Sequence, residues 1–295
     1  MAPIVRVKDL RKVYRIGKEK VVALDRIDLT IEPGEIVSIV GPSGSGKSTL
    51  LNQLAGLEKP TRGDVYIGRH NVSKMNENAL AEFRQKYLGF VFQSYNLLPA
   101  LTAEENVALP LMFKGMDKKE RTRHAREQLK RMGLLSHAKH KPTEMSGGQQ
   151  QRVGIARAFV GDPKVIFADE PTGNLDTRTT KLVMDTMLSY AREKGITFIM
   201  VTHDNDLAKV ADRIVTIRDG RVLSDHRHTP ESLPDLPPVE EEPQEEQAPA
   251  DGPEAPAEKA AAAKETEQEV QQAEGTAPLP KQEEKAASQP EGNEV

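Results

Sequence analysis

The clearest hydrophobic pattern in the chain is the apolar run EIVSIV at residues 35–40, which stops at a glycine-rich turn before a helix-compatible segment. An apolar run of this length predicts a strand that is buried on both faces of a sheet. Two similar runs, at residues 165–168 and 196–201, predict two more buried strands. Three such strands, separated by longer segments, indicate an α/β fold.

Alternating patterns predict further strands around these runs. Apolar and polar side chains alternate from residue 4 to residue 13, ending at Tyr14, and a second alternating stretch, 29–31, leads into the turn Pro33-Gly34. Shorter strands are predicted at 64–67, 89–92 and 211–222, the last with a turn at Asp219-Gly220, and helices at 76–86 and 179–194.

The middle of the chain has a helical pattern with few strands, from Ser94 to about His140. Thr102 followed by Glu105 is typical of a capping box at a helix start. Residues 117–132 are strongly charged, with three apolar residues spaced to share one helix face: Ala125, Leu129 and Met132. We predict a helical subdomain at about residues 94–160, inserted into the α/β core.

The glycine-rich turn after residue 40 has the pattern of a phosphate-binding loop, G-x-x-x-x-G-K-[ST]. Glycines let the backbone wrap a phosphate chain with its N–H groups, and the following helix points its positive end at the anion. A glycine-rich turn that carries a lysine by chance is the alternative, and the buried strand before the turn argues against it. The predicted nucleotide-binding residues are Gly41, Ser43, Gly44, Ser45, Gly46, Lys47, Ser48 and Thr49.

A second helix start lies at MSGGQQQRVGIARAF, residues 145–159. Ser146, Gly147 and Gly148 present a hydroxyl and free amides that can bind a second phosphate group. Since Ser-Gly-Gly before a helix is usually only a cap, this stretch alone is weak support for a phosphate site.

Two acidic residues, Asp169 and Glu170, follow the buried run at 165–168. In an open α/β sheet, ligands bind at the carboxyl ends of the strands, beside the phosphate loop. We predict that Asp169 supports Mg²⁺ and that Glu170 orients or deprotonates the attacking water. The alternative is a solvated strand end or a cap of the next helix.

Three other residues are candidates by position. His203 follows the run at 196–201, so its ring is a candidate contact of the terminal phosphate, although a lone histidine is more often structural. Tyr14 ends the first predicted strand and has two equally supported roles, stacking on adenine or packing on the sheet edge. Asp176 ends the turn PTGNLD and is predicted to be free to meet a neighbouring molecule.

Charge divides the chain unevenly. The net charge is −4 over 295 residues, yet residues 229–295 hold 18 acidic and only 4 basic residues, with 11 of the 20 prolines and no aromatic residue. Such a segment buries too little apolar surface to offset its ordering entropy, so we predict that it is disordered.

Composition also limits the class of protein. The absence of cysteine excludes a disulfide framework and a cysteine-ligated zinc site. The first residues lack the apolar core of a signal peptide, and runs such as ITFIMV are far shorter than the ~20 residues of a membrane span. A membrane role therefore requires a partner that supplies the spans. Basic residues between 118 and 131 suggest nucleic-acid binding, but interleaved acids and missing aromatics favour a solvated helix face.

The order of these motifs resembles that of the nucleotide-binding subunits of ABC transporters. GPSGSGKST is similar to Walker A, Gln93 to the Q-loop residue, MSGGQ to the signature motif, VIFADE to Walker B, NLD to the D-loop and His203 to the H-switch. The resemblance covers residues 4–222. Met145 stands where the family usually has leucine, a swap that conserves volume.

The resemblance implies a P-loop NTPase core with an N-terminal antiparallel β subdomain, an inserted helical subdomain, and an ATP hydrolase that uses ATP and Mg²⁺. It implies a head-to-tail homodimer in which Ser146, Gly147, Gly148 and Gln149 of one protomer, with Asp176 nearby, cover the nucleotide of the other. The implied roles are adenine stacking for Tyr14, Mg²⁺ binding for Ser48, Gln93 and Asp169, and catalysis for Glu170, His203 and Gln93.

Two stretches, FVFQSYNLLPALTAEENVALPL and ADEPTGNLD, look most like the lipoprotein-releasing and macrolide-efflux branch, near the FtsE-type ATPases. This likeness implies a separate permease, similar to those of the FtsX or MacB type, that docks near the helical subdomain on the cytoplasmic face of the membrane. Two alternatives stay open: a non-transport regulator of cell-wall hydrolysis, and a soluble ATPase acting on nucleic acid or ribosomes. The second alternative is disfavoured because the chain has neither long coiled coils, zinc cysteines nor a second cassette, and no direct nucleic-acid partner is expected.

Overall fold

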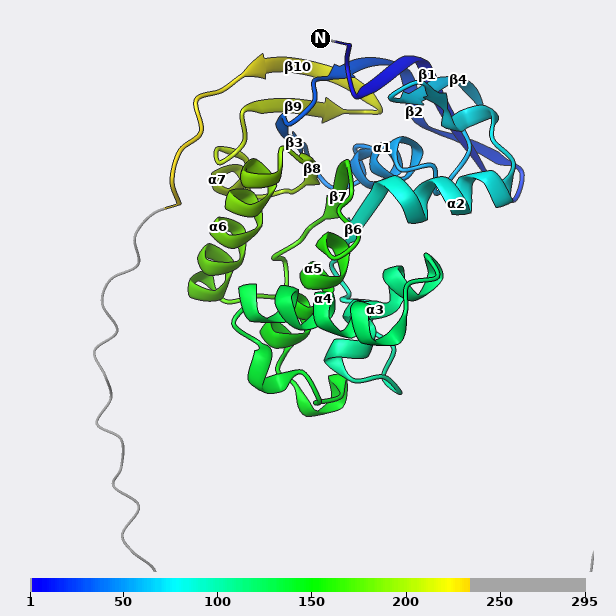
Figure 1. The fold of residues 1–295 in the computed structure, drawn as a ribbon. Helices are drawn as coiled ribbons and strands as arrows, with labels where there is room; N and C mark the ends of the chain where they lie inside the picture. The colour runs from blue at the N-terminus through cyan, green and yellow to red at the C-terminus, as the bar shows by residue number, and fades with distance from the viewer. Residues whose placement is uncertain (1, 234–295) are drawn as a thin grey trace, which may run out of the picture. The chain divides into compact units, whose positions relative to one another are not determined.

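Two β-sheets organise residues 2–233, the part of the chain that the computed structural model describes (Figure 1). The larger sheet has the strand order β10-β9-β3-β8-β7-β6, in which β3, β6, β7, β8 and β9 are parallel and β10 is antiparallel to β9. Its strands are β3 (Ile36–Val40), β6 (Leu88–Val91), β7 (Val165–Asp169), β8 (Thr197–Val201), β9 (Arg213–Arg218) and β10 (Arg221–Arg227). The disorder predicted for the acidic tail concerns residues 229–295, of which 234–295 lie outside the described part.

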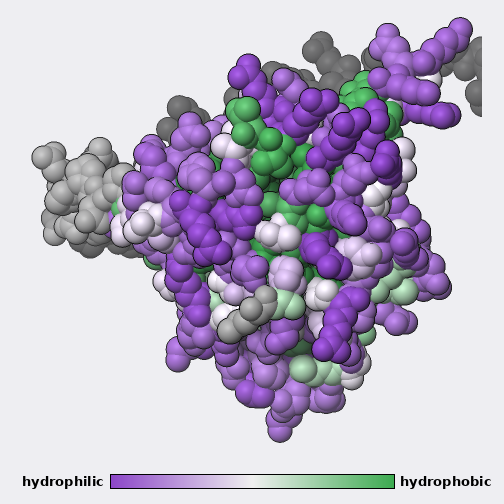
Figure 2. All heavy atoms as spheres, turned by 90° about the horizontal axis from the view of Figure 1, so that it is seen from above, coloured by the Kyte–Doolittle hydropathy of each residue, from purple (hydrophilic) through white to green (hydrophobic). Residues whose placement is uncertain are grey.

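The strands β3, β7 and β8 of the larger sheet are buried on both faces, which explains their continuous apolar runs. Neighbouring residues of β3, Ile36 and Val37, belong to two separate hydrophobic clusters, and Ile166 and Phe167 of β7 divide in the same way. Successive side chains of a strand point to opposite faces, so each strand contributes to both clusters. The surface seen from above is mostly hydrophilic, with apolar residues gathered mainly near the middle of this view (Figure 2).

The smaller sheet is antiparallel, with the order β2-β1-β4-β5. Its strands are β1 (Val5–Ile16), β2 (Glu19–Ile31), β4 (Arg62–Ile67) and β5 (His70–Asn71). β1 and β2 form a longer hairpin than the sequence predicted. Near its end Tyr14 pairs with Val21, and the chain turns tightly at Gly17, where φ is +61°. Exposed side chains at this tip hide the alternation on which the prediction relied.

Four helices accompany the strands: α1 (Lys47–Leu54), α2 (Glu77–Tyr87), α6 (Thr177–Lys194) and the short α7 (Asn205–Ala208). Asn76 caps α2 by accepting a hydrogen bond from the Ala79 amide at 2.9 Å. Glycine 195 ends α6 in the left-handed conformation. The helices predicted at 76–86 and 179–194 are therefore confirmed, within two residues at each end.

The inserted helical segment contains α3 (Ala103–Phe113), α4 (Lys118–Arg131) and α5 (Gly147–Phe159), with single 3₁₀ turns at Leu135–His137 and Pro142–Glu144. The predicted capping box at the start of α3 is confirmed, with Thr102 and Glu105 bonding each other's backbone. The predicted apolar face is also confirmed, since its three residues are at most 4% exposed. This segment lies below the sheets in Figure 1.

At the end of the described chain, the strand and turn predicted at 211–222 are found as β9 and the turn at Asp219-Gly220, and the sequence analysis missed the second strand of this hairpin, β10. The segment predicted to be disordered begins at residue 229, and its described part, residues 229–233, contacts the domain. The Glu231 amide donates to the carbonyl of Lys209 at 2.9 Å, and Leu233 is only 8% exposed.

Candidate active site

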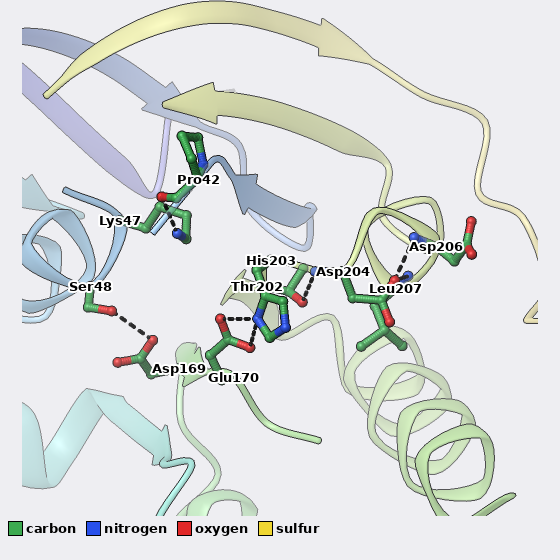
Figure 3. Close-up of polar contacts among 10 residues, drawn as sticks. All are labelled: Pro42, Lys47, Ser48, Asp169, Glu170, Thr202, His203, Asp204, Asp206 and Leu207. Carbon is green, nitrogen blue, oxygen red and sulfur yellow. Dashed lines mark hydrogen bonds and ion pairs between the residues drawn. The ribbon is translucent and has the colours of Figure 1, made fainter. Parts of the chain in front are cut away.

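Four parallel strands end at the same edge of the larger sheet and deliver the predicted site residues. The register pairs Ile39 with Val201, Val201 with Asp169 and Ala168 with Val91, so β3, β8, β7 and β6 terminate side by side. The phosphate loop follows β3, His203 follows β8, the acidic pair ends β7, and Gln93 follows β6. Figure 3 shows the side chains of the first three groups pointing into one region.

The phosphate loop is held tightly against its neighbours. A Cβ on Gly41, where φ is +152°, would lie 2.0 Å from the carbonyl oxygen of Ile217, and one on Gly46, where φ is +100°, would lie 2.5 Å from that of Ala23. The loop therefore requires glycine at both ends for packing as well as for conformation. The Nζ atom of Lys47 donates to the carbonyl of Pro42 at 2.9 Å, so the lysine curls over the loop itself (Figure 3).

We expect Gly41→Ala to lower the melting temperature strongly, because the new methyl group has no space beside the Ile217 carbonyl. Gly44→Ala is the matched control: it lies in the same loop at φ +76° with no atom within 4 Å of its Cβ. Gly44→Ala should lower the free energy of unfolding only by the cost of a side chain on a left-handed backbone residue, about 1–2 kcal/mol. Thermal unfolding of both variants checks this, and equal losses would mean that strain, not the contact with Ile217, sets the requirement.

Ser48 and Asp169 form the oxygen-rich part of the site. The Ser48 hydroxyl donates to Oδ1 of Asp169 across 3.1 Å, joining the start of α1 to the end of β7. Burial raises the pKa of the Asp169 carboxyl, and the Glu170 charge adds to this, while Ser48 and Lys47 oppose it. Hydroxyl and carboxylate oxygens are the ligands that Mg²⁺ prefers, and a cation there would offset the burial and the like charge.

We expect Asp169→Asn to melt at a higher temperature than the unmodified protein when no nucleotide is present. The amide keeps an acceptor for Ser48 and removes a buried charge next to Glu170. Each kcal/mol gained corresponds to about 2–4 °C in a domain of this size. Scanning calorimetry without nucleotide measures the change, and a lower melting temperature would show that the carboxylate stabilises the empty site.

Glu170 and His203 are directly joined. Nδ1 of His203 lies 2.7 Å from both carboxylate oxygens of Glu170, so Nδ1 carries the hydrogen that it donates (Figure 3). The Glu170 side chain is 17% exposed and that of His203 69% exposed. Glu170 has a positive φ of +47°, uncommon for a residue other than glycine, and such strain is often found at functional sites.

The Q-loop and the turn after Glu170 are linked by hydrogen bonds. Asn174 donates its side-chain amide to the Gln93 carbonyl at 2.9 Å. Gln151 of α5, which the sequence analysis did not single out, donates to the carbonyl of Phe92 at 3.3 Å and to that of Pro171. Gln151 is 2% exposed. A glutamine among the apolar residues of a helix face is the sequence signal that could have identified it.

The signature residues stand at the start of α5. Ser146 and Gln149 form a reciprocal capping box, in which the Ser146 amide donates to Oε1 of Gln149 at 2.9 Å and the Gln149 amide donates to Oγ of Ser146 at 3.3 Å. Their glycines lie close to the neighbouring loop and helix, Gly147 to the Tyr95 hydroxyl and Gly148 to Thr179. Ser146 is exposed, and the three residues after it are half-buried.

Asp176, which we predict to be free to meet a neighbouring molecule, is exposed and also caps a helix. Its carboxylate accepts from the amide of Thr179 at 2.9 Å and from the Thr179 hydroxyl at 2.6 Å, so it caps α6. These hydrogen bonds lower the pKa of Asp176. The turn predicted at PTGNLD is confirmed, and the helix that begins directly after it uses the Asp176 carboxylate as its N-terminal cap.

Tyr14 is held by its hydroxyl group, which donates to Oε2 of Glu58 at 2.7 Å. Burial and this hydrogen bond raise the pKa of the phenol. Nζ of Lys12 lies 5.0 Å from the ring centroid. The ring is therefore held by a hydrogen bond at its hydroxyl group and by a cation over one face.

Among residues 2–233, no group of three or more histidine or acidic side chains is arranged to hold a metal ion. A cation at Ser48 and Asp169 would therefore need additional ligands from phosphate or water. None of the helices described is long and apolar enough to cross a bilayer.

Comparison with known proteins gives consistent matches. Residues 24–173 match the family described as ABC transporter. The chain is 50% identical over 220 residues to an uncharacterised ABC transporter ATP-binding protein, MJ1508, of Methanocaldococcus jannaschii, covering 75% of this chain and 98% of that protein. It is 46% identical to the lipoprotein-releasing system ATP-binding protein LolD of Geobacter metallireducens, covering 76% of this chain and all of LolD (100%).

Two further matches concern a larger protein and a solved structure. The chain is 45% identical to the macrolide export ATP-binding/permease protein MacB of Shigella flexneri, covering 76% of this chain and 34% of MacB. The dimeric structure of the ATP-binding cassette MJ0796 in a post-hydrolysis state with ADP and Pi superimposes with a TM-score of 0.73 at 44% identity. It covers 77% of this chain and 100% of that one.

Proposed function

The chain belongs to the ABC transporter family as an ATP-hydrolysing subunit, and from this premise we propose that it powers a separate membrane permease of the lipoprotein-releasing or macrolide-exporting type. One observation supports this proposal most: four strand ends bring a phosphate loop, an acidic pair and a histidine to one edge of a parallel sheet. The similarity to LolD and MacB favours transport over cell-wall regulation and over a soluble nucleic-acid or ribosome ATPase.

The nucleotide would be held by the residues that the sequence analysis assigned. The amides of residues 41–49 face the phosphates, and Lys47 exchanges the Pro42 carbonyl for phosphate oxygens, a charge-assisted bond. Tyr14, already oriented by Glu58, stacks on adenine. Ser48, Asp169 and Gln93 would hold Mg²⁺, which would supply positive charge to the outer phosphates.

Glu170 is the proposed base. Among residues 2–233, His203 is the only hydrogen-bond donor to its carboxylate, at 2.7 Å, and a carboxylate with a free lone pair can accept a proton from water. His203 donates through Nδ1 to Glu170, and Nε2, when it also carries a hydrogen, donates to the terminal phosphate on the other side of the ring. Glu170 and His203 therefore act as one hydrogen-bonded pair on the attacking water and on the phosphate.

A second protomer is proposed to complete each site. The Ser146 hydroxyl and the free amides at the start of α5 form an anion-binding helix end, and MJ0796, a 44% identical cassette, has a dimeric structure. We propose that Ser146, Gly147, Gly148 and Gln149 of one protomer cover the phosphates bound by the other, with Asp176 at the edge of the interface. ATP then closes the pair and hydrolysis opens it.

The cysteine-free sequence allows a direct test. Ser43→Cys and Ser146→Cys proteins carrying different tags are mixed, both with Glu170→Gln to slow hydrolysis, and then oxidised with and without ATP. We expect an ATP-dependent disulfide that joins the two tags. No disulfide between the two tags with ATP, or an equal yield without ATP, would contradict the shared site.

The permease is proposed to dock at an apolar groove of about 410 Å³ between α2, β6, α3 and α5. Phe113 is 67% exposed at its edge and Leu57 43% exposed. Exposed apolar side chains gathered in a groove are typical of a protein interface. Since the groove begins next to Phe92, which precedes Gln93, docking there connects the permease with the active site at the cytoplasmic face of the membrane.

A further inference from the structure

A histidine to which the sequence analysis assigned no role contacts the signature residues. Nε2 of His137 lies 3.2 Å from the side-chain nitrogen, Nε2, of Gln149. His137 is half-buried and ends the 3₁₀ turn Leu135–His137, which lies between α4 and α5. The two residues are 12 positions apart, so the fold of the helical segment brings them together.

The backbone around His137 is fixed. Its amide donates to the carbonyl of Leu134 at 3.0 Å, and its carbonyl accepts from the amide of His140 at 3.0 Å. Leu134 and Ala138, on either side, are 1% and 2% exposed and belong to the core that the helical segment shares. The ring of His140 lies 5.0 Å from the ring of His137, centroid to centroid. The turn therefore holds the His137 ring in a defined place.

The hydrogen-bond pattern determines which atoms donate. The backbone amide of Ser146 donates to Oε1 of Gln149, so the nitrogen of the same side-chain amide faces His137. This nitrogen can only donate, and therefore Nε2 of His137 accepts. The ring hydrogen is then on Nδ1, which lies 3.1 Å from the hydroxyl oxygen of Ser136 and donates to it. Both ring nitrogens thus have a partner of the correct type.

The contact restrains Gln149 at the atom that the capping box leaves free. Ser146 binds the oxygen of the amide group and His137 binds its nitrogen, so the Gln149 side chain is restricted to one orientation. A glutamine side chain that becomes ordered only when an interface forms loses rotamer freedom, and this loss weakens binding. A side chain that is already ordered avoids much of that cost.

We propose that His137 is a positioning residue, whose hydrogen bond preorganises Gln149 and the Ser146 cap for the nucleotide bound by the partner protomer. The inference rests on the proposed function, because it concerns the same shared site. His137 acts through Gln149 and does not touch the nucleotide. Loss of its acceptor should weaken the ATP-dependent pairing of protomers, while nucleotide binding by a single protomer, through Tyr14 and Lys47, stays unchanged.

Two substitutions separate the hydrogen bond from the shape of the ring, each in the full chain carrying Glu170→Gln to slow hydrolysis. His137→Phe keeps a ring and removes the acceptor, whereas His137→Gln supplies a carbonyl oxygen that can accept from Gln149. Size-exclusion chromatography over a series of ATP concentrations gives the concentration at which half of the protein is dimeric. We expect His137→Phe to need about 2- to 10-fold more ATP, the effect of losing one hydrogen bond between neutral groups, and His137→Gln to match the parent chain.

His124→Phe is the matched control, since His124 lies on α4 with a side chain that is 37% exposed, and it should pair like the parent chain. Calorimetric titration with ADP, which lacks the terminal phosphate, measures binding by the single protomer and should give equal affinities for all variants. Equal ATP requirements of His137→Phe and the parent chain overturn the proposal. So does a weaker ADP affinity of His137→Phe, or a His137→Gln protein that pairs no better than His137→Phe.

The parent chain separates this inference from the proposed function. If it forms ATP-dependent dimers and His137→Phe forms them equally well, only the role of His137 is wrong. If the parent chain forms no ATP-dependent dimer, the shared site of the proposed function fails, and the role of His137 fails with it.

Discussion

Glu170→Gln should still bind ATP while its turnover falls by ~10²-fold or more. Glutamine keeps the shape and one acceptor oxygen for His203, whose Nδ1 lies 2.7 Å from each carboxylate oxygen, but it cannot take a proton from water. Binding is expected to survive because the phosphates are held by the loop at 41–49, not by Glu170. Equilibrium titration with ATP and a steady-state phosphate-release assay measure the two quantities.

Glu193→Gln is the matched control, an exposed glutamate on α6 whose carboxylate lies 3.5 Å from Nη1 of Arg131. It should leave turnover and affinity unchanged. If Glu170→Gln turned over at the unmodified rate, Glu170 would not be the base, and its contact with His203 would have only a positioning role.

Lys47→Ala is expected to have the second-largest effect, a loss of ATP affinity of at least ~100-fold, since hydrogen bonds from a charged group contribute about 1.5–3 kcal/mol each. The Lys47 side chain is only 8% exposed and its ammonium group lies within the phosphate loop, on the Pro42 carbonyl. Alanine leaves the phosphates without a cation at the place where their charge is highest. Calorimetric titration with a non-hydrolysable ATP analogue measures the loss.

Lys59→Ala removes an exposed lysine that pairs with Glu77 at 3.7 Å, and its affinity should equal that of the unmodified protein. A Lys47→Ala protein with normal affinity would be incompatible with the phosphate cradle. Circular dichroism of both variants confirms that a loss does not come from unfolding.

Local sequence patterns were sufficient wherever one segment carries its own signal. The buried runs at 165–168 and 196–201 became β7 and β8 because both faces of a central strand are apolar. The capping boxes of α3 and α5 follow from two residues three positions apart. The sequence analysis missed the full length of the β1–β2 hairpin and the cap by Asp176. Both depend on which backbone groups lie nearby, and the pattern of side chains does not indicate this.

The sequence by itself determined the phosphate loop, the acidic pair and the helices that carry the signature, because each is encoded in contiguous residues. Only the tertiary structure decided which of these meet. Ser48 and Asp169 are 121 positions apart and become hydrogen-bonded because β7 lies one strand from β3 in the sheet, with β8 between them. The contacts of Gln151 likewise depend on the fold, since its partners, the carbonyls of Phe92 and Pro171, come from two other segments of the chain.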